Sequence, residues 1–215
     1  MYQKKRNGES MRNNAKTFFG VNLSILVFVT WLLGACSGDK PEIQAVSEEE
    51  AAEINAIGNQ AAGLLMKTLQ HELLSAIQHS GVPGAIDVCR LRALKLTDSL
   101  ATVINRVEKI KRTSSKIRNP RNKADRYEEE ALAYFSERSP AVFSDTYIQK
   151  LTDEKGTVYR FYKPMQVKPL CLTCHGRSES FGAELAERLK KAYPQDQATG
   201  YQADDFRGVI SIAIR

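Results

Sequence analysis

The stretch Cys171-Leu172-Thr173-Cys174-His175 decides how the rest of this chain is interpreted. C-x-x-C-H is the attachment pattern of a c-type haem. Two thiols three positions apart can each bond to one vinyl group of the porphyrin, and the histidine that follows then lies under the iron as its proximal ligand. With four Cys and three His in 215 residues, an accidental match is expected about once in a thousand such chains. The pattern therefore predicts one covalent haem c on Cys171 and Cys174, with its iron bound by His175.

Two other interpretations of the motif are a disulfide between Cys171 and Cys174, either redox-active or structural, and half of a zinc site. A structural zinc site usually needs a second ligand pair of similar spacing, and the remaining candidates are scattered: Cys36, Cys89, His71 and His79. A thioredoxin-like C-x-x-C would open a helix after a strand in a βαβ unit, whereas this motif follows what reads as an antiparallel strand. Haem attachment is therefore favoured over both alternatives.

The N-terminal 35 residues have the pattern of a targeting segment. A basic region precedes an apolar run from Phe18 to Leu33 that is too short for a comfortable membrane span. The run ends in Leu33-Gly34-Ala35-Cys36, which resembles the lipobox of bacterial lipoproteins, where cleavage precedes the cysteine and its thiol carries the lipid. An uncleaved anchor and an ordinary signal peptide with an incidental cysteine are the alternatives. We expect residues 1–35 to be a signal peptide and 36–47 a tether lipidated at Cys36.

This targeting pattern places the protein outside the cytoplasm, where c-type haem is also attached. The predicted product is a lipoprotein anchored to the membrane and facing the periplasm, and Ser37 resembles outer-membrane sorting more than inner-membrane retention. Residues 1–35 hold five Lys/Arg and one Glu, so their removal lowers the formal net charge from +6 to +2. Because the remainder has no sustained basic cluster, we expect no nucleic-acid binding.

Residues 48–215 are long enough for one domain with its own core. Ser47, followed by three glutamates, starts a long amphipathic helix that Gly81 ends. Pro83 starts a second helix. One apolar stripe of this second helix carries Ile86, Cys89, Ala93, Leu96 and Leu100.

The period of the apolar pattern changes farther along the chain. Residues 105–117 lean towards β structure, and Asp125 with Glu128 opens a helix to about residue 137. Strands at 147–151 and 157–167 flank the turn Asp153-Glu154-Lys155-Gly156 as a hairpin. A helix at 181–193 and a strand at 208–215 complete the order. We therefore predict an α+β fold, with long N-terminal helices before a mainly antiparallel sheet that has helices to one side.

Several stretches of the chain together resemble the family called DUF3365, or Tll0287-like haem domains, over about residues 48–215. These stretches are Ala85-Ile86-Asp87-Val88-Cys89, Arg118-Asn119-Pro120, Tyr162-Lys163-Pro164 with the run into Cys171-Leu172-Thr173-Cys174-His175-Gly176, and Phe206-Arg207-Gly208-Val209-Ile210-Ser211. The resemblance implies a PAS-like fold and a c-type haem. It also implies that His175 and Cys89 are the two axial ligands of the iron.

The residues themselves also bear on Cys89. A cysteine on an apolar helix stripe is more often a core residue than a ligand. However, if the other three cysteines carry lipid and haem, Cys89 is the thiol left over in an oxidising compartment. The chain has no Cys, His or Met after His175, so a second ligand must come from upstream. We expect the start of its helix, with Arg90 and Arg92, to favour the thiolate of Cys89.

The other upstream candidates for a second ligand are weaker. His71 and His79 are expected to be solvated or capping histidines, while Met66 and Met165 are expected to fill the core. Aromatic side chains that could wall the haem are Tyr159, Phe161, Tyr162 and Phe181.

The predicted function is a redox or small-ligand sensor whose iron is bound by histidine and cysteine. A thiolate opposite histidine stabilises ferric iron, which suits a switch better than a fast electron carrier. A separate signalling or redox partner protein would then read the change. The alternative is a periplasmic electron-transfer cytochrome with one haem. A peroxidase-like enzyme is less favoured, because Cys89 would block the open position that such an enzyme needs.

Overall fold

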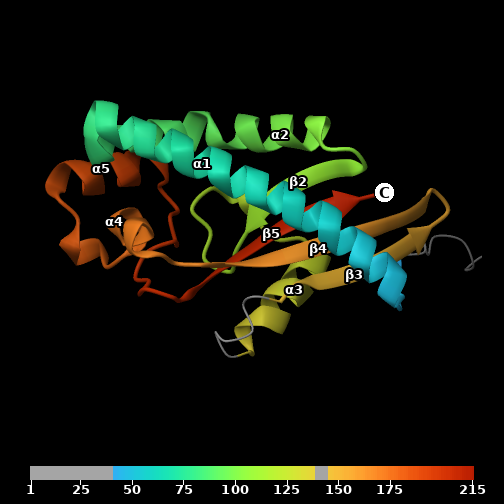
Figure 1. Cartoon of the computed structure of the whole chain (residues 1–215). Coiled ribbons are helices and arrows are strands. Elements are labelled where there is room, and N and C mark those ends of the chain that lie inside the picture. The colour runs from blue at the N-terminus through green and yellow to red at the C-terminus, as the bar shows by residue number, and fades with distance from the viewer. Residues whose placement is uncertain (1–40, 139–144) are drawn as a thin grey trace, which may run out of the picture. The chain divides into compact units, whose positions relative to one another are not determined.

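The computed structural model describes residues 41–138 and 145–215, and its centre is a five-stranded sheet (Figure 1). The strand order is β1-β3-β4-β5-β2, and every neighbouring pair is antiparallel. The strands are β1 Glu42–Gln44, β2 Val107–Thr113, β3 Tyr147–Asp153, β4 Gly156–Gln166 and β5 Phe206–Ile214. This antiparallel sheet after long helices confirms the predicted α+β, PAS-like fold class.

The helix that precedes the sheet is α1, Glu48–Leu91. Ser47 and Glu50 form a capping box at its start, as two reciprocal bonds between side chain and backbone. Gly81 interrupts the helix with φ 68° and ψ 176°, a backbone conformation that favours glycine. The helical backbone is thus broken at Gly81, where the first helix was predicted to end, and we call the parts of α1 before and after it the first and second arms.

The second predicted helix is divided at Arg92, where α1 ends and α2, Ala93–Val103, begins. Arg92 forms an ion pair of 2.9 Å with Glu72 on the first arm of α1. The apolar stripe continues across the break, with Ile86 and Ala93 both buried. Because the apolar period is unchanged there, periodicity alone could not reveal the division.

Helices cover both faces of the sheet, so the expectation of helices on one side is wrong. On one face, Phe161 and Ile212 pack against Ile54 and Leu65 of α1. On the other, Tyr162 packs against Phe135 of α3, Arg126–Ser136. Successive residues of a strand point to opposite faces, and β5 is apolar in both directions, so each face of the sheet needs a cover.

Other local predictions are confirmed. Asp125 and Glu128 cap α3 reciprocally, and the β3–β4 hairpin closes between Asp153 and Gly156 around two turn residues. The helix expected at 181–193 is α5, Ala183–Ala192.

The start of the described chain differs from the expected tether. Residues 42–44 pair with β3 as an edge strand, because their backbone groups complete the ladder of an otherwise open edge. Within residues 41–138 and 145–215, none of the helices has the length and apolar character to cross a bilayer.

Candidate functional site

The C-x-x-C-H motif forms two short helical turns after β4. Pro169–Cys171 is a 3₁₀ turn, η3, and Leu172–His175 is α4. In such a turn, residues three positions apart lie on the same side, which is how Cys171 and Cys174 are presented together. Both are free thiols, so the disulfide interpretation has no support. Among the described residues there is also no group of three or more His, Cys, Asp and Glu that could hold a metal ion, as a zinc site would need.

The imidazole of His175 is fixed by one hydrogen bond. Its Nδ1 lies 2.7 Å from the carbonyl oxygen of Ala198, and because a carbonyl can only accept, Nδ1 carries the proton and donates it. Burial, and to a smaller extent the positive charges of Arg118, Arg207 and Arg112, lower the pKa of His175 to about 3. The ring is therefore neutral at physiological pH, and its Nε2 keeps a lone pair for a metal ion.

The carbonyl that orients His175 is itself held by a charged pair that sequence reasoning missed. Arg118 donates from Nη2 to the carbonyls of Cys174 (2.5 Å) and Ala198 (3.3 Å), and from Nε to Asp196 (2.9 Å). The other carboxylate oxygen of Asp196 accepts the backbone N–H of Ala198 at 2.8 Å. The stretch Arg118-Asn119-Pro120 carried part of the family resemblance, but nothing in its spacing pointed to Asp196.

Cys89 lies on the second arm of α1, in the same region as the motif. Its neighbour Ile86 packs in one cluster with Cys174 and with Leu185 and Leu189 of α5. Burial is the main cause that raises the pKa of the Cys174 thiol, and the electrostatic effect of Cys89 raises it a little more. The structure thus brings three predicted site residues, Cys89, Cys174 and His175, to one place, together with Cys171 of the same turn.

The expected electrostatic neighbours of Cys89 were wrong. Arg90 pairs with Asp87 at 3.8 Å, and Arg92 pairs with Glu72. Burial raises the pKa of the Cys89 thiol, and the charges that oppose this come from Arg112 and Arg118. Both lie at or just after β2, far from Cys89 in the sequence.

The competing ligand candidates lie elsewhere. His71 and His79 are exposed, and Nδ1 of His79 donates to the carbonyl of Ser75 at 2.7 Å. Met66 is 44% exposed and so does not fill the core, whereas Met165 packs against the cluster between α1 and the sheet, as expected.

Most of the aromatic side chains expected to wall the site pack in other places. Phe161 is buried under α1, Tyr162 lies on the opposite face of the sheet, and the hydroxyl of Tyr159 donates to Glu50. Phe181 alone among the four lines a cavity beside the motif.

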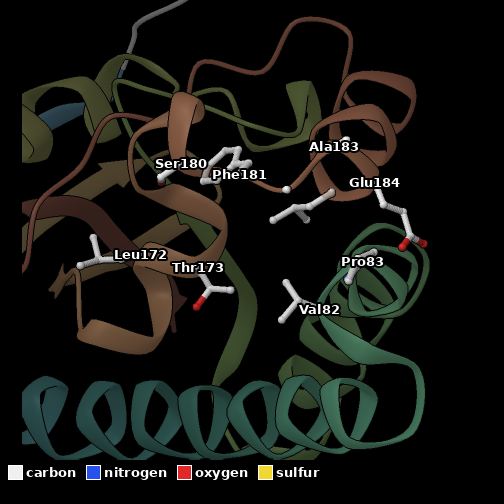
Figure 2. A pocket seen from close by; sticks show the side chains of 10 residues that line it. Val82, Pro83, Leu172, Thr173, Ser180, Phe181, Ala183 and Glu184 are labelled. Carbon is white, nitrogen blue, oxygen red and sulfur yellow. The ribbon is translucent and has the colours of Figure 1, made fainter.

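That cavity has a volume of about 480 Å³ and lies between the motif, the break in α1 at Gly81 and the start of α5 (Figure 2). Its wall is largely apolar and comes from three parts of the chain. The lining residues include Val82 and Pro83 of α1, Leu172 and Thr173 of the motif, and Phe181 and Leu185. The side chains of Val82 and Thr173 face one another across it in Figure 2. An apolar cavity beside two free thiols and a neutral imidazole suits a flat, hydrophobic, metal-bearing ligand.

The fold and the site define an α+β domain of PAS-like architecture that carries a C-x-x-C-H turn at the end of its sheet. The chain matches the profile of the Tll0287-like family over residues 41–215 and belongs to that family. Its structure is similar to that described as "Crystal structure of the cyanobacterial heme-protein Tll0287", with a TM-score of 0.52 and 21% sequence identity. The match covers 79% of this chain and 96% of the other, and it supports the same fold. No curated protein matches the sequence.

Proposed function

We propose that this protein binds one haem c covalently, through thioether bonds from Cys171 and Cys174, with His175 and Cys89 as the axial ligands of the iron. The observation that carries the proposal is the bond from His175 Nδ1 to Ala198, which leaves Nε2 free beside two unpaired thiols. The similar structure is described as that of a heme-protein, which supports the same cofactor here.

The residues of the site fit such a group. The apolar wall of the cavity can exclude water from a porphyrin face, and the ring of His175 is oriented by a partner that also fixes its tautomer. Cys89 supplies a second ligand from another element, so that α1 and the motif would be joined through one metal ion.

Acid–acetone extraction of the purified full chain tests the attachment. Haem bound through thioether bonds stays with the polypeptide, whereas non-covalent haem leaves with the solvent. A full chain with Cys171→Ser and Cys174→Ser is the control, and it should release its haem. Extraction of the colour from the wild-type protein would exclude the covalent claim.

The physiological role that we propose is a redox or small-ligand sensor. When bound, haem supplies an iron that changes its charge by one electron. Cys89 would hold ferric iron as a thiolate and would hold ferrous iron less strongly, and burial raises the pKa of Cys89. Protonation of the thiol would therefore compete with the metal once a redox partner had donated an electron to the iron. Release of Cys89 would free the second arm of α1 to move against the motif, a change that a separate signalling partner could read.

Carbon monoxide binding and the midpoint potential of the full chain separate a sensor from an electron carrier. A sensor of this kind should have a low potential and bind carbon monoxide after reduction, because Cys89 leaves a coordination position. A high potential without carbon monoxide binding would favour the periplasmic electron carrier.

We further propose a lipid anchor at Cys36, which lies outside the described residues, as does the signal segment 1–35. The apolar run that ends in Leu33-Gly34-Ala35 supports it, and it would hold the haem domain at a membrane facing the periplasm, with the outer membrane favoured by Ser37. Labelling cells with radioactive palmitate tests the anchor. Label should enter the wild-type protein and be lost in Cys36→Ser; equal labelling of both proteins would refute it.

A further inference from the structure

Three arginines from separate parts of the chain act electrostatically on His175, and two of them, Arg112 and Arg118, also act on Cys89. Arg112 comes from β2, Arg118 from the link after β2, and Arg207 from β5. The charges of all three lower the pKa of His175, after the larger effect of burial. Arg118 is neutralised by Asp196, but among the described residues neither Arg112 nor Arg207 forms an ion pair with a carboxylate.

Arg112 lies on the face of the sheet that α1 covers. It pairs in register with Ile210, whose side chain packs against α1, and residues directly opposite each other in an antiparallel pair share a face. Within the described part of the chain, its guanidinium has neither a hydrogen bond nor an ion pair. No side-chain nitrogen or oxygen in that part is both fully buried and unpaired, so the guanidinium nitrogens of Arg112 are not completely enclosed by protein.

Arg207 is similarly short of a counter-charge. Its guanidinium lies 5.1 Å from the centre of the Tyr201 ring and donates to the backbone carbonyl of Lys116 at 3.2 Å. Burial lowers the pKa of Arg112, Cys89 raises it, and the like charge of Arg207 lowers it further. Two cations are therefore close enough to repel each other, beside a third that is already paired.

Partly buried cations without a counter-ion are costly, and the fork of an arginine is shaped to bind a carboxylate by two parallel bonds. We propose that Arg112 and Arg207 form an anion-binding subsite that holds the propionate carboxylates of the haem. This inference rests on the proposed function, which already places haem beside both His175 and Cys89. It assigns the two carboxylates of that group to the two cations that form no ion pair with a carboxylate among the described residues.

Resonance Raman spectra of the full chain with haem attached test the assignment, because the bending bands of the propionates respond to their hydrogen bonds. Arg112→Gln and Arg207→Gln should each shift these bands while the haem stays covalently attached. Arg121→Gln is the matched control, since Arg121 is exposed and its guanidinium has no partner among the described residues. Unshifted bands in both Arg112→Gln and Arg207→Gln would overturn the inference.

A binding experiment isolates the carboxylates. In the full chain with Cys171→Ser and Cys174→Ser, added haemin binds reversibly, and its dimethyl ester has the same porphyrin without the negative charges. Arg112→Gln should weaken haemin binding about tenfold and leave ester binding unchanged. An equal loss for both compounds would overturn the inference. If Arg112→Gln does not fold, as judged by circular dichroism, Arg112→Lys tests the same point. Lysine keeps the charge but lacks the two-pronged guanidinium, so this variant should also bind haemin more weakly than wild type while its affinity for the ester stays unchanged.

A free anion is the other source of the same chemistry. If calorimetry detects acetate binding to the wild-type protein that Arg112→Gln abolishes, while the propionate bands do not shift, the subsite holds a free anion and the assignment to haem is wrong. If the proposed function itself were wrong, the wild-type protein would carry no covalent haem, so the two failures can be told apart.

Discussion

The sheet region and the motif region of this protein are held together in different ways. Between the first arm of α1, the sheet and α3, apolar side chains fill the space, and several are completely buried, such as Phe161 and Ile212. Around the motif, the apolar clusters are small, and charged side chains bond instead to backbone carbonyls. The comparison teaches that the sheet is specified by its own packing, whereas the site depends on a few polar partners.

The strongest test of this contrast is Asp196→Ala. The ion pair of Asp196 with Arg118 is largely buried, with 12% and 11% of the two side chains exposed, so its loss leaves Arg118 with an uncompensated charge. We expect the free energy of unfolding of the full chain to fall by about 3 kcal/mol in urea denaturation. Lys168→Ala is the control, because its pair with Asp204 is exposed and should contribute less than about 1 kcal/mol. If the two substitutions lowered the free energy of unfolding equally, the claim that the motif region depends on a few polar partners would be wrong.

A steric test addresses the sheet region. A Cβ on Gly58 of α1 would lie 2.3 Å from the ring of Phe161, whereas one on Gly63 of the same helix meets nothing within 4 Å. Gly58→Ala should therefore lower the free energy of unfolding by about 1–3 kcal/mol. Gly63→Ala should raise it by up to about 1 kcal/mol, since alanine is the better helix former. Thermal or urea denaturation measures both, and a stabilising Gly58→Ala would show that this core is loosely packed.

The smallest expected effect concerns the edge of the sheet region and depends on pH. Glu50 accepts hydrogen bonds from Lys150 and from Tyr159, both 2.6 Å long, and with the backbone bond to Ser47 they lower its pKa from 4.5 to about 2. A lowered pKa means that the carboxylate stabilises the fold above pH 4.5, and that this contribution is lost as the pH falls to about 2. Glu50→Gln should be less stable than wild type at pH 7, and the difference should shrink over that range. Glu49→Gln is the matched control at pH 7, because Glu49 is exposed in the same turn and its loss should change the free energy of unfolding little.

The parts of the fold that the sequence predicted correctly are those in which nearby residues determine the structure. The capping box of Asp125 and Glu128 and the hairpin turn from Asp153 to Gly156 each involve residues within four positions. The motif was found for the same reason. By contrast, Arg118 and Asp196 are 78 positions apart, and the packing of α3 on the second face of the sheet depends on how distant strands align. These features follow from tertiary packing, which no local pattern of residues reveals.

The surroundings of Cys89 could be predicted from the sequence only in part. Its place on an apolar stripe was visible in the sequence, and the family resemblance pointed to it as a ligand. The arginines that act on it could not be identified in this way. Arg90 and Arg92 are its neighbours in sequence but form ion pairs with acidic residues of α1, while the arginines that act on it are Arg112 of β2 and Arg118 of the link after β2.

The central claim is that α1 and the motif region meet at one iron, bound by Cys89 and His175. The ferric absorption spectrum of the full chain with Cys89→Ala tests it most directly, with His71→Ala as the control because His71 is exposed on the first arm of α1. We predict that Cys89→Ala keeps its covalent haem but loses the low-spin spectrum of a thiolate ligand, and that His71→Ala retains it. A ferric spectrum that is unchanged by Cys89→Ala and altered by His71→Ala would contradict the account.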